Sequence, residues 1–382
     1  ITSVMQTGIT VSVLSMDGGD RKVIHPNAAH ILSHCAVRLL GRPSRGLVLL
    51  SLFGLLARRP ISTLRNLSET VRSKERWKQF RAVPHALWCL KQRVSLLHAH
   101  FADENLEYAA LISQWSGVPY SVTTHRYDIV EEPISIELAS KLFNEALLVA
   151  TISRYNQALM LERFKLNSGL VELARCGVDV DRFHFQPPSM KTEQDLFDVL
   201  AVGRLVHVKG HDLLIRAIGK LAQQGRRTTA CIVGAGPEEE KLRALCAEEG
   251  VTELIHFAGA QPQTEVMSLL YRSRVFVLAS RDEGNTVACM ETMAAGTPII
   301  TTRITGLPEL IQDQGNGLLV TPEDPTALAE AIVKILSNPD LADGFARAAR
   351  NTIETEFNRI ACTSHLLQLL ELAMKRWQSN SP

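Results

Sequence analysis

The chain has 382 residues, of which 46% are hydrophobic, and its 41 Lys and Arg residues nearly balance 40 Asp and Glu residues, for a formal net charge of +1. This length exceeds what one hydrophobic core usually supports, so it predicts two domains. The balanced charge argues against a protein that binds polyanions through its overall charge. The longest apolar run, residues 46–57, is too short to span a bilayer.

Cysteine usage indicates a reduced compartment. The seven cysteines are odd in number and scattered, and no two of them form a C-x-x-C pair. Each is therefore interpreted as a small apolar core residue rather than as part of a disulfide framework or a metal site. A cytoplasmic location is the prediction that follows.

Short apolar runs alternate with helical patterns from residue 9 to about 182, as in a doubly wound α/β domain. Strands are predicted at residues 9–15, 94–98, 119–124, 148–152 and 171–176. A second series follows, with strands near 197–203, 228–233, 254–258, 274–279, 298–302 and 317–320, and helices near 210–224, 237–249, 263–272, 286–295 and 326–336. The polar stretch 185–195 between the two series is the predicted linker, and residues 340–377 are predicted to be helical.

Residues 58–93 form a helical, basic stretch with ten Lys or Arg residues against only Glu69 and Glu75. Three aromatic residues are interleaved with these charges: Trp77, Phe80 and Trp88. One interpretation is a solvated helix face that packs its aromatic residues inward. The other is contact with a membrane surface or an anionic acceptor. No recognised nucleic-acid-binding module accompanies the charge, so no nucleic-acid partner is expected.

Two carboxylates, Glu283 and Glu291, stand eight positions apart after the predicted strand 274–279. Glu283 lies in a loop beside Gly284, and Glu291 lies about two turns into the following helix. Eight steps of about 100° leave the two residues roughly 80° apart around a helix, so they are expected to reach one ligand from a loop and from a helix wall. Free amides at the helix start, near Val287, add an anion site. This arrangement suits a sugar joined to a nucleoside diphosphate.

The E-x7-E spacing and its surroundings resemble the family-4 retaining glycosyltransferases, of the glycosyltransferase group 1 type. Further blocks of this family occur in the same order: residues 203–217, 230–237, 257–259 and 306–309. The resemblance is clear from about residue 196 to 340 and thinner before that. It implies the GT-B fold of the α/β class, in which two Rossmann-like doubly wound domains face a cleft.

The resemblance and the linker together predict an N-terminal acceptor-side domain at residues 1–185 and a C-terminal nucleotide-sugar-binding domain at residues 186–360. A C-terminal helix at residues 361–382 is expected to return toward the N-terminal domain. The run from Gly8 to Met16 resembles the second strand of a Rossmann-like domain. The N-terminal domain is therefore expected to lack its first strand and the loop after it.

By the same resemblance, Arg204 and Lys209, which follow Gly203, are the expected clamp for the diphosphate. Negative charge develops on the phosphate as it leaves, and two fixed cations with helix-start amides can stabilise that charge without a metal ion. Glu291 is expected to accept hydrogen bonds from the ribose hydroxyls, since an ionised carboxylate can take two O–H donors. Glu283 is expected to meet the hydroxyls of the donor sugar.

Residues beside Glu283 complete the expected donor site. Gly284 lets the backbone approach the ligand closely. The backbone N–H groups of Asn285 and Thr286 are expected near the donor sugar. The site so defined calls for no metal ion and no cofactor, because the nucleoside-diphosphate sugar is itself a substrate.

In the N-terminal domain, candidate residues follow the ends of two predicted strands. His125 resembles the family's cleft histidine, which faces the donor sugar, and Asp128 follows at the expected short spacing. A histidine at the carboxyl end of a strand in an α/β domain is well placed to bind a ligand. His98 and His100 form an H-x-H pair, for which lining of the cleft by His100 is favoured over zinc, because no third ligand accompanies the pair.

Two other patterns are not assigned to the site. Asp179 and Asp181 spell D-x-D, which binds metal in a different glycosyltransferase fold, but here the pair resembles the family's strand exit near the hinge. Gly234-Ala235-Gly236 lacks the third glycine of a dinucleotide fingerprint, and three glutamates follow it. It is interpreted as a turn.

The sequence thus predicts a metal-independent, retaining hexosyltransferase, such as serves polysaccharide biosynthesis. It would move a sugar from a nucleotide-sugar donor to a hydroxyl of a glycan, a lipid-linked glycan or a small molecule. Two alternatives stay open: a nucleotide-sugar epimerase on a GT-B scaffold, and a catalytically inactive donor-binding remnant. Peripheral contact with the inner face of the membrane through residues 58–93 also stays open.

Overall fold

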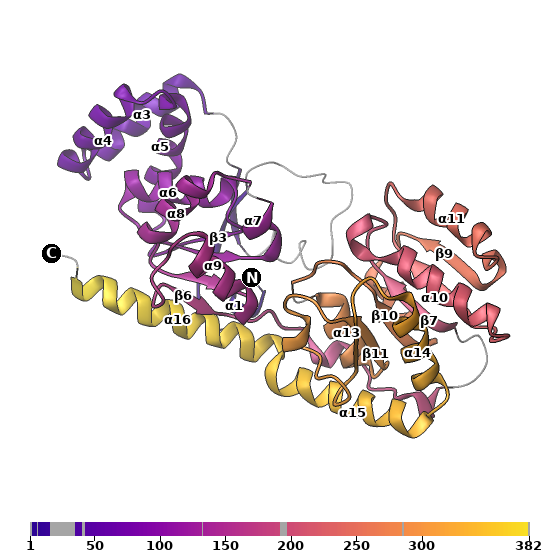
Figure 1. Cartoon of the computed structure of the whole chain (residues 1–382). Helices are drawn as coiled ribbons and strands as arrows, with labels where there is room; N and C mark the ends of the chain where they lie inside the picture. The colour runs from indigo at the N-terminus through magenta and orange to yellow at the C-terminus, as the bar shows by residue number, and fades with distance from the viewer. Residues whose placement is uncertain are drawn as a thin grey trace. The chain divides into compact units, whose positions relative to one another are not determined.

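The computed structural model describes residues 2–5, 7–15, 35–39, 43–131, 133–191, 197–284 and 286–380. The chain divides into two units, each with its own parallel sheet (Figure 1). Unit 1 comprises residues 1–152, 156–174 and 363–382, and unit 2 comprises residues 153–155 and 175–362.

Unit 2 is built on a six-stranded parallel sheet with the strand order β12-β11-β10-β7-β8-β9. Its strands are β7 (Phe197–Val202), β8 (Ala230–Val233), β9 (Ile255–Gly259), β10 (Ser273–Leu278), β11 (Ile299–Thr302) and β12 (Leu318–Val320). The central strands β7 and β10 are apolar from their third residue onward, as expected for a parallel sheet that is covered on both faces. The predicted strands and helices of this half of the chain all occur in the structure, with bounds shifted by one or two residues at most ends.

Helices cover both faces of the unit 2 sheet. They are α10 (His211–Gln223), α11 (Glu239–Glu248), α12 (Gln263–Tyr271), α13 (Val287–Ala295), α14 (Pro325–Leu336) and α15 (Pro339–Glu356), with short 3₁₀ turns η1 (Val180–Arg182), η2 (Pro188–Met190), η3 (His207–Lys209), η4 (Thr252–Leu254) and η5 (Leu307–Glu309). Neighbouring residues of β7 belong to hydrophobic clusters on opposite faces of the sheet: Val199 packs with α10 and α14, whereas Leu200 packs with α13 and α15. This alternation follows from the two-residue period of a strand.

Residues 175–185 belong to unit 2, although they were predicted to be part of the N-terminal domain. Val178 and Phe183 are buried in the same core cluster as Phe357. The backbone also ties them there, since Val178 N–H donates to the carbonyl oxygen of Phe357 at 2.9 Å. Of the predicted linker, residues 192–195 lie outside the described residues.

Unit 1 contains a four-stranded parallel sheet in the order β3-β4-β5-β6: β3 (Leu97–His100), β4 (Tyr120–Thr124), β5 (Val149–Thr151) and β6 (Val171–Leu173). A separate two-stranded parallel sheet joins β1 (Ser12–Ser15), inside the predicted strand 9–15, to β2 (Ala36–Leu39), which was not predicted. Strand β3 begins at Leu97 rather than at residue 94, because Leu97 N–H is the first to bond to the neighbouring strand, at the carbonyl oxygen of Pro119.

The helices of unit 1 are α1 (Thr2–Met5), α3 (Arg45–Leu56), α4 (Pro60–Arg72), α5 (Arg76–Lys91), α6 (Glu104–Ser116), α7 (Arg126–Val130), α8 (Ile136–Glu145), and parts of α9 (Arg154–Arg163) and α16 (Arg359–Asn380). Trp115 and Phe143 are the largest fully buried side chains of its core. Helices α3, α4 and α5 gather at one end of unit 1 (Figure 1, indigo). In α16, His365 Nε2 lies 3.1 Å from the carbonyl oxygen of Leu173.

Gly210, between η3 and α10, is expected to tolerate no side chain. Its φ is +66°, and a Cβ there would lie 1.9 Å from the carbonyl oxygen of Ala279. Gly225 has a similar φ of +73° but nothing within 4 Å of its Cβ position. Gly225→Ala should therefore lower the free energy of unfolding by about 1 kcal/mol, the cost of the left-handed backbone. Gly210→Ala should lower it by about 2–4 kcal/mol, because backbone must also move.

Urea unfolding of the full chain, followed by circular dichroism, measures both changes. Equal losses in the two variants would contradict the close approach of Gly210 to the β10 loop.

Candidate functional site

The strand order of unit 2 defines a switch point between β7 and β10. The chain runs outward from β7 through β8 to β9 and then returns to β10 on the other side of β7. In open α/β sheets, ligands bind outside the carboxyl ends of the strands at such a point. The loops that follow β7 and β10 carry the predicted residues Arg204, Lys209 and Glu283.

Lys209 and Glu283 meet at this switch point. The ammonium group of Lys209 forms an ion pair with Glu283 Oε1, and Ser280 Oγ donates to the same oxygen at 2.8 Å. The side chain of Glu283 is largely buried, and the hydroxyl of Thr305 donates to its backbone carbonyl oxygen. A buried carboxylate is stable only when it is paired and hydrogen-bonded. The pair therefore fixes one cation and one anion at the carboxyl edge of the sheet.

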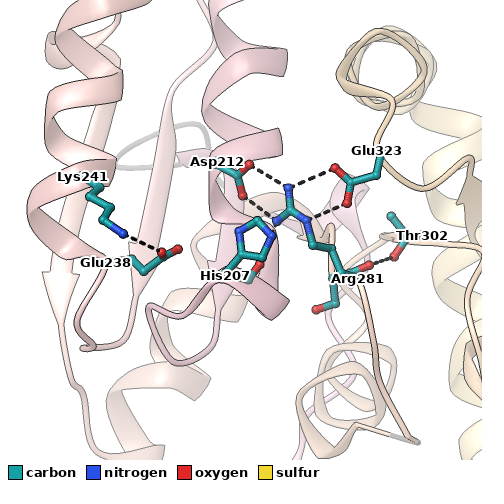
Figure 2. A network of polar contacts seen from close by, with 8 residues as sticks. His207, Asp212, Glu238, Lys241, Arg281, Thr302 and Glu323 are labelled. Atoms are coloured by element: carbon teal, nitrogen blue, oxygen red, sulfur yellow. Dashed lines mark hydrogen bonds and ion pairs between the residues drawn. The ribbon is translucent and has the colours of Figure 1, made fainter.

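Arg281 holds the two loops together (Figure 2). Its guanidinium group makes two hydrogen bonds of 2.8 Å to the carboxylate of Asp212 in α10 and approaches Glu323 at 2.6 Å. It also donates to the carbonyl oxygen of His207 at 2.7 Å, and its backbone N–H donates to that of Val208 at 2.8 Å. The turn that leads to Lys209 is thus bound to the segment that leads to Glu283.

The Asp212 carboxylate is kept ionised by this contact. Burial acts to raise the pKa of Asp212, but the hydrogen bonds and the charge of Arg281, together with smaller contributions, hold the pKa below its ordinary value. Bidentate arginine–carboxylate pairs are both stronger and more strongly oriented than ordinary hydrogen bonds. A second bond fixes the β10 end of the segment, since Thr302 Oγ1 donates to the carbonyl oxygen of Ser280 at 2.5 Å (Figure 2).

Glu291 lies in the second turn of α13 and is held by partners that the sequence did not indicate. Gln263 in α12 donates to Glu291 Oε1 at 2.5 Å, and Arg182 donates to Gln263 Oε1 at 3.1 Å. Burial raises the pKa of Glu291, while the bond from Gln263 and the charge of Arg182 oppose that rise. No local sequence pattern could predict these two hydrogen bonds, because Gln263 stands 28 residues from Glu291 and 81 residues from Arg182.

The start of α13 lies between the two carboxylates in sequence. Thr286 caps this helix, since its Oγ1 accepts from Cys289 N–H at 3.3 Å. The first amides of a helix lack intrahelical acceptors and favour an anion. Gly284 precedes the cap, whereas Asn285 lies outside the described residues. In the loop after β7, Gly203 is partly buried and Arg204 is exposed.

In unit 1, the predicted residues also come together at strand ends. His100 Nδ1 lies 3.3 Å from His125 Nε2, and the two rings stack with centroids 5.4 Å apart. Both carboxylate oxygens of Asp128 accept backbone N–H groups at 2.6 Å, from Ala102 and from His125. Asp128 thereby ties the loop after β3 to the loop after β4, a positioning contact that its spacing alone did not suggest.

Protonation states in this cluster follow from burial. Burial and, to a lesser extent, the neighbouring His100 together lower the pKa of His125 to about 4, so His125 is neutral at pH 7. Burial raises the pKa of Asp128 to about 7, although its two N–H donors act in the opposite direction. Both ring nitrogens of His98 are taken by hydroxyls, those of Ser121 at 2.8 Å and Thr123 at 3.0 Å.

The D-x-D pattern lies elsewhere in unit 2. Asp179 forms an ion pair with Arg359 at 2.9 Å, and Asp181 is exposed. Across the part of the chain that the structure describes, no three His, Cys, Asp or Glu side chains are arranged to hold a metal ion.

Residues 183–352 match the model of a family described as "Glycosyl transferases group 1". This segment is a group 1 glycosyl transferase domain. It contains the predicted residues of unit 2, from Gly203 to Glu291, together with Gln263 and Arg281.

The chain is also similar to three individual proteins. It is 33% identical over 209 residues to the putative colanic acid biosynthesis glycosyltransferase WcaL of Escherichia coli K12, a match that covers 53% of this chain and 51% of that protein. The chain thus spans about half the length of this relative. A crystal structure of a glycosyltransferase from Rickettsia africae superposes with a TM-score of 0.72 at 19% identity, covering 99% of this chain and 93% of that one.

The third is Anabaena Alr3699/HepE in complex with UDP-glucose, with a TM-score of 0.70 at 19% identity, covering 91% of this chain and 90% of that one. These structures confirm the predicted fold, which is GT-B with two Rossmann-like units. Over residues 183–352, the predicted glycosyltransferase group 1 type is confirmed as well.

Within the glycosyl transferase domain, removal of the Arg281 guanidinium should cost more stability than removal of a surface arginine. Arg281→Met leaves two carboxylates facing each other and should lower the free energy of unfolding by about 1.5–3 kcal/mol. Arg303 pairs with Asp313 but is half exposed, so Arg303→Met should cost about 1 kcal/mol or less. Chemical denaturation of both variants tests this order, and an Arg281→Met variant as stable as Arg303→Met would disprove it.

Proposed function

We propose that the protein transfers a sugar from a nucleoside diphosphate to an acceptor hydroxyl, with retention of configuration at the anomeric carbon. The observation that carries the proposal is the meeting of Lys209 and Glu283 at the switch point of the group 1 glycosyl transferase domain. The donor binds unit 2. The acceptor is a glycan, a lipid-linked glycan or a small molecule, and it binds unit 1.

Departure of the diphosphate is the step that needs stabilisation. When the bond from the anomeric carbon to the phosphate oxygen breaks, negative charge grows on that oxygen. Lys209, Arg204 and the first amides of α13 supply positive charge there, so no divalent metal ion is needed. The acceptor oxygen forms its bond on the same face of the sugar, and its proton passes to the departing phosphate oxygen.

Glu283 changes partners in this scheme. Without a donor, its carboxylate neutralises Lys209. A bound diphosphate competes for the ammonium group, and the carboxylate then accepts hydroxyls of the donor sugar. Ser280, which donates to Glu283 Oε1, keeps the carboxylate oriented while its ionic partner changes.

Ribose recognition falls to Glu291. Gln263 occupies Oε1 and so orients the second carboxylate oxygen, Oε2, for a ribose hydroxyl. Gly284 and Thr286 bring backbone close to the sugar–diphosphate linkage, and Gly203 does the same on the β7 side. In unit 1, His125 and His100 are proposed to contact the sugar or the acceptor, with Asp128 as the residue that positions His125.

None of the helices within the described ranges combines the length and the apolar content that crossing a bilayer requires. A cytoplasmic location, with peripheral contact at the inner face of the membrane through residues 58–93, is part of the proposal.

Glu291→Gln should weaken the binding of nucleoside diphosphates by about 1.5–3 kcal/mol, because an amide loses charge-assisted bonds to the ribose. Calorimetric titration of UDP and GDP into the full chain measures the change. Glu248→Gln, at an exposed position of α11, is the matched control and should bind as the wild type does. Unchanged affinity in Glu291→Gln would show that ribose is held elsewhere.

Arg204→Ala should separate catalysis from stability. Arg204 is exposed, so its loss should change the free energy of unfolding by less than about 0.5 kcal/mol. Donor hydrolysis, measured with EDTA present, should fall by roughly 10²–10³, the usual size for removal of one stabiliser of developing charge. Arg226→Ala, on the exposed loop after α10, should retain the wild-type rate.

Three outcomes would count against the proposal. Wild-type hydrolysis in Arg204→Ala would place the diphosphate somewhere else. Activity that EDTA abolishes and Mn²⁺ or Mg²⁺ restores would overturn the metal-independent mechanism. Release of an epimerised nucleotide sugar without any acceptor would favour the epimerase.

A further inference from the structure

Helix α4 buries polar residues and exposes apolar residues, the opposite of what is usual for a helix on a protein surface in water. Its buried residues are the polar Thr63, Asn66 and Thr70. Leu67 packs partly against the core, but three other apolar residues point outward: Ile61 is 85% exposed, Leu64 is 58% exposed, and Val71 is exposed as well. A surface helix normally buries its apolar stripe and leaves its polar side to solvent.

The rotation of α4 is fixed by specific bonds. Asn66 Nδ2 donates to the carbonyl oxygen of Gln114 at 2.6 Å, and the guanidinium group of Arg59, at the start of the helix, donates to the carbonyl oxygen of Ser116. The hydroxyls of Thr63 and Thr70 find no hydrogen-bond partner among the described residues. The polar side of α4 therefore faces the rest of unit 1, although two of its buried hydroxyls have no hydrogen-bond partner there, while the apolar side faces outward.

Helix α3, which packs beside α4, exposes a second apolar surface. Its inward residues are Val48, Ser51 and Leu55. The residues opposite them are Leu49, Leu50 and Phe53, of which Leu50 is 71% exposed and Phe53 is 69% exposed. We call these three residues, together with Ile61, Leu64 and Val71 of α4, the α3–α4 face. Exposed apolar surface of this extent marks a site that another apolar phase covers.

The charges around the α3–α4 face are almost all positive. From residue 43 to residue 78, eight Lys or Arg residues accompany only two acids, Glu69 and Glu75. Arg65 and Arg72 lie on α4 itself and are exposed. Trp77, at the start of α5, is half exposed, and the guanidinium carbon of Arg45 lies 5.1 Å from its ring centroid. Tryptophan with a basic rim is typical of the bilayer interface.

We propose that the α3–α4 face docks the protein on a bilayer that contains anionic lipids. The two helices have 12 and 13 residues, too few to span the hydrocarbon core, so they lie in the interface with their apolar residues below the headgroups. Arg65, Arg72 and Arg45 then meet lipid phosphates. A second copy of the chain fits the face less well, because self-association would bring like charges together around it.

This docking needs neither nucleotide nor sugar, so its test is independent of the proposed transferase activity. The full chain is mixed with vesicles of phosphatidylcholine alone or with added phosphatidylglycerol, and bound protein is measured by sedimentation. Wild-type protein should bind the anionic vesicles more tightly. Raising the salt from about 0.1 M to about 0.5 M should weaken this binding, because the Debye length shortens.

Two pairs of variants separate the apolar from the electrostatic contribution. Phe53→Ser with Ile61→Ser should lower partitioning by about tenfold or more, whereas Ile360→Ser with Leu372→Ser, at similarly exposed positions of α16, should leave it unchanged. Arg65→Gln with Arg72→Gln should remove most of the preference for anionic vesicles. Arg226→Gln with Arg227→Gln, which are exposed in unit 2, should keep that preference.

Trp77 reports the depth of docking. Brominated lipids should quench part of the fluorescence of the bound wild type, and Trp77→Phe should remove that quenching. Three results would each overturn the proposal: wild-type protein that does not sediment with anionic vesicles, equal losses in the face variants and their controls, or quenching that survives in Trp77→Phe. A dimer in light scattering that Phe53→Ser with Ile61→Ser abolishes, without vesicle binding, would assign the face to a second copy instead.

Discussion

Arg281 is the contact on which the geometry of the donor side depends. Its guanidinium group binds Asp212 in α10, Glu323 after β12 and the carbonyl oxygen of His207 in η3. One side chain of the segment after β10 thus joins the segments that follow β7 and β12. Gly210 makes this junction possible, because its missing side chain lets the η3 turn lie against Ala279. Lys209 and Glu283 stand on the two sides of the junction. Their distance is set before any ligand arrives, which is the preorganisation that stabilisation of a departing phosphate requires.

The ion pair between Lys209 and Glu283 has two opposed effects. It allows a carboxylate to remain buried, since an isolated buried charge would be far more costly. It also neutralises the cation that the phosphate is proposed to use. Ligand binding must therefore replace the Glu283 carboxylate at Lys209 with a phosphate. The contribution of Lys209 to the free energy of binding is the difference between its interaction with the phosphate and its interaction with Glu283. A diphosphate carries more charge than one carboxylate, and the α13 amides add to its side of the exchange.

Features that depend on neighbouring residues were predictable, and features that join distant segments were not. The alternation of apolar runs predicted the strands of the six-stranded and four-stranded sheets, although not β2, and the pattern around Glu283, Gly284 and Glu291 predicted a loop followed by a helix. The partners of Glu291 were missed, since Gln263 comes from another helix and Arg182 from a turn before the linker. In the basic stretch 58–93, Phe80 and Trp88 pack toward the core, as one of the two interpretations expected, whereas Trp77 is exposed.

Helix α3 shows why the exposed face could not be predicted. Its sequence is apolar almost all round, so it has no period from which the buried side could be read. Helix α4 does have a period, but its polar side is the buried one. Exposure of Ile61 and Leu64 to water is unfavourable, because full burial of a side chain of this kind contributes about 1.5–3 kcal/mol. The bonds from Asn66 and Arg59 to the end of α6 nonetheless hold α4 in the observed orientation. A bilayer surface would remove these outward apolar side chains from water without any rotation of the helix.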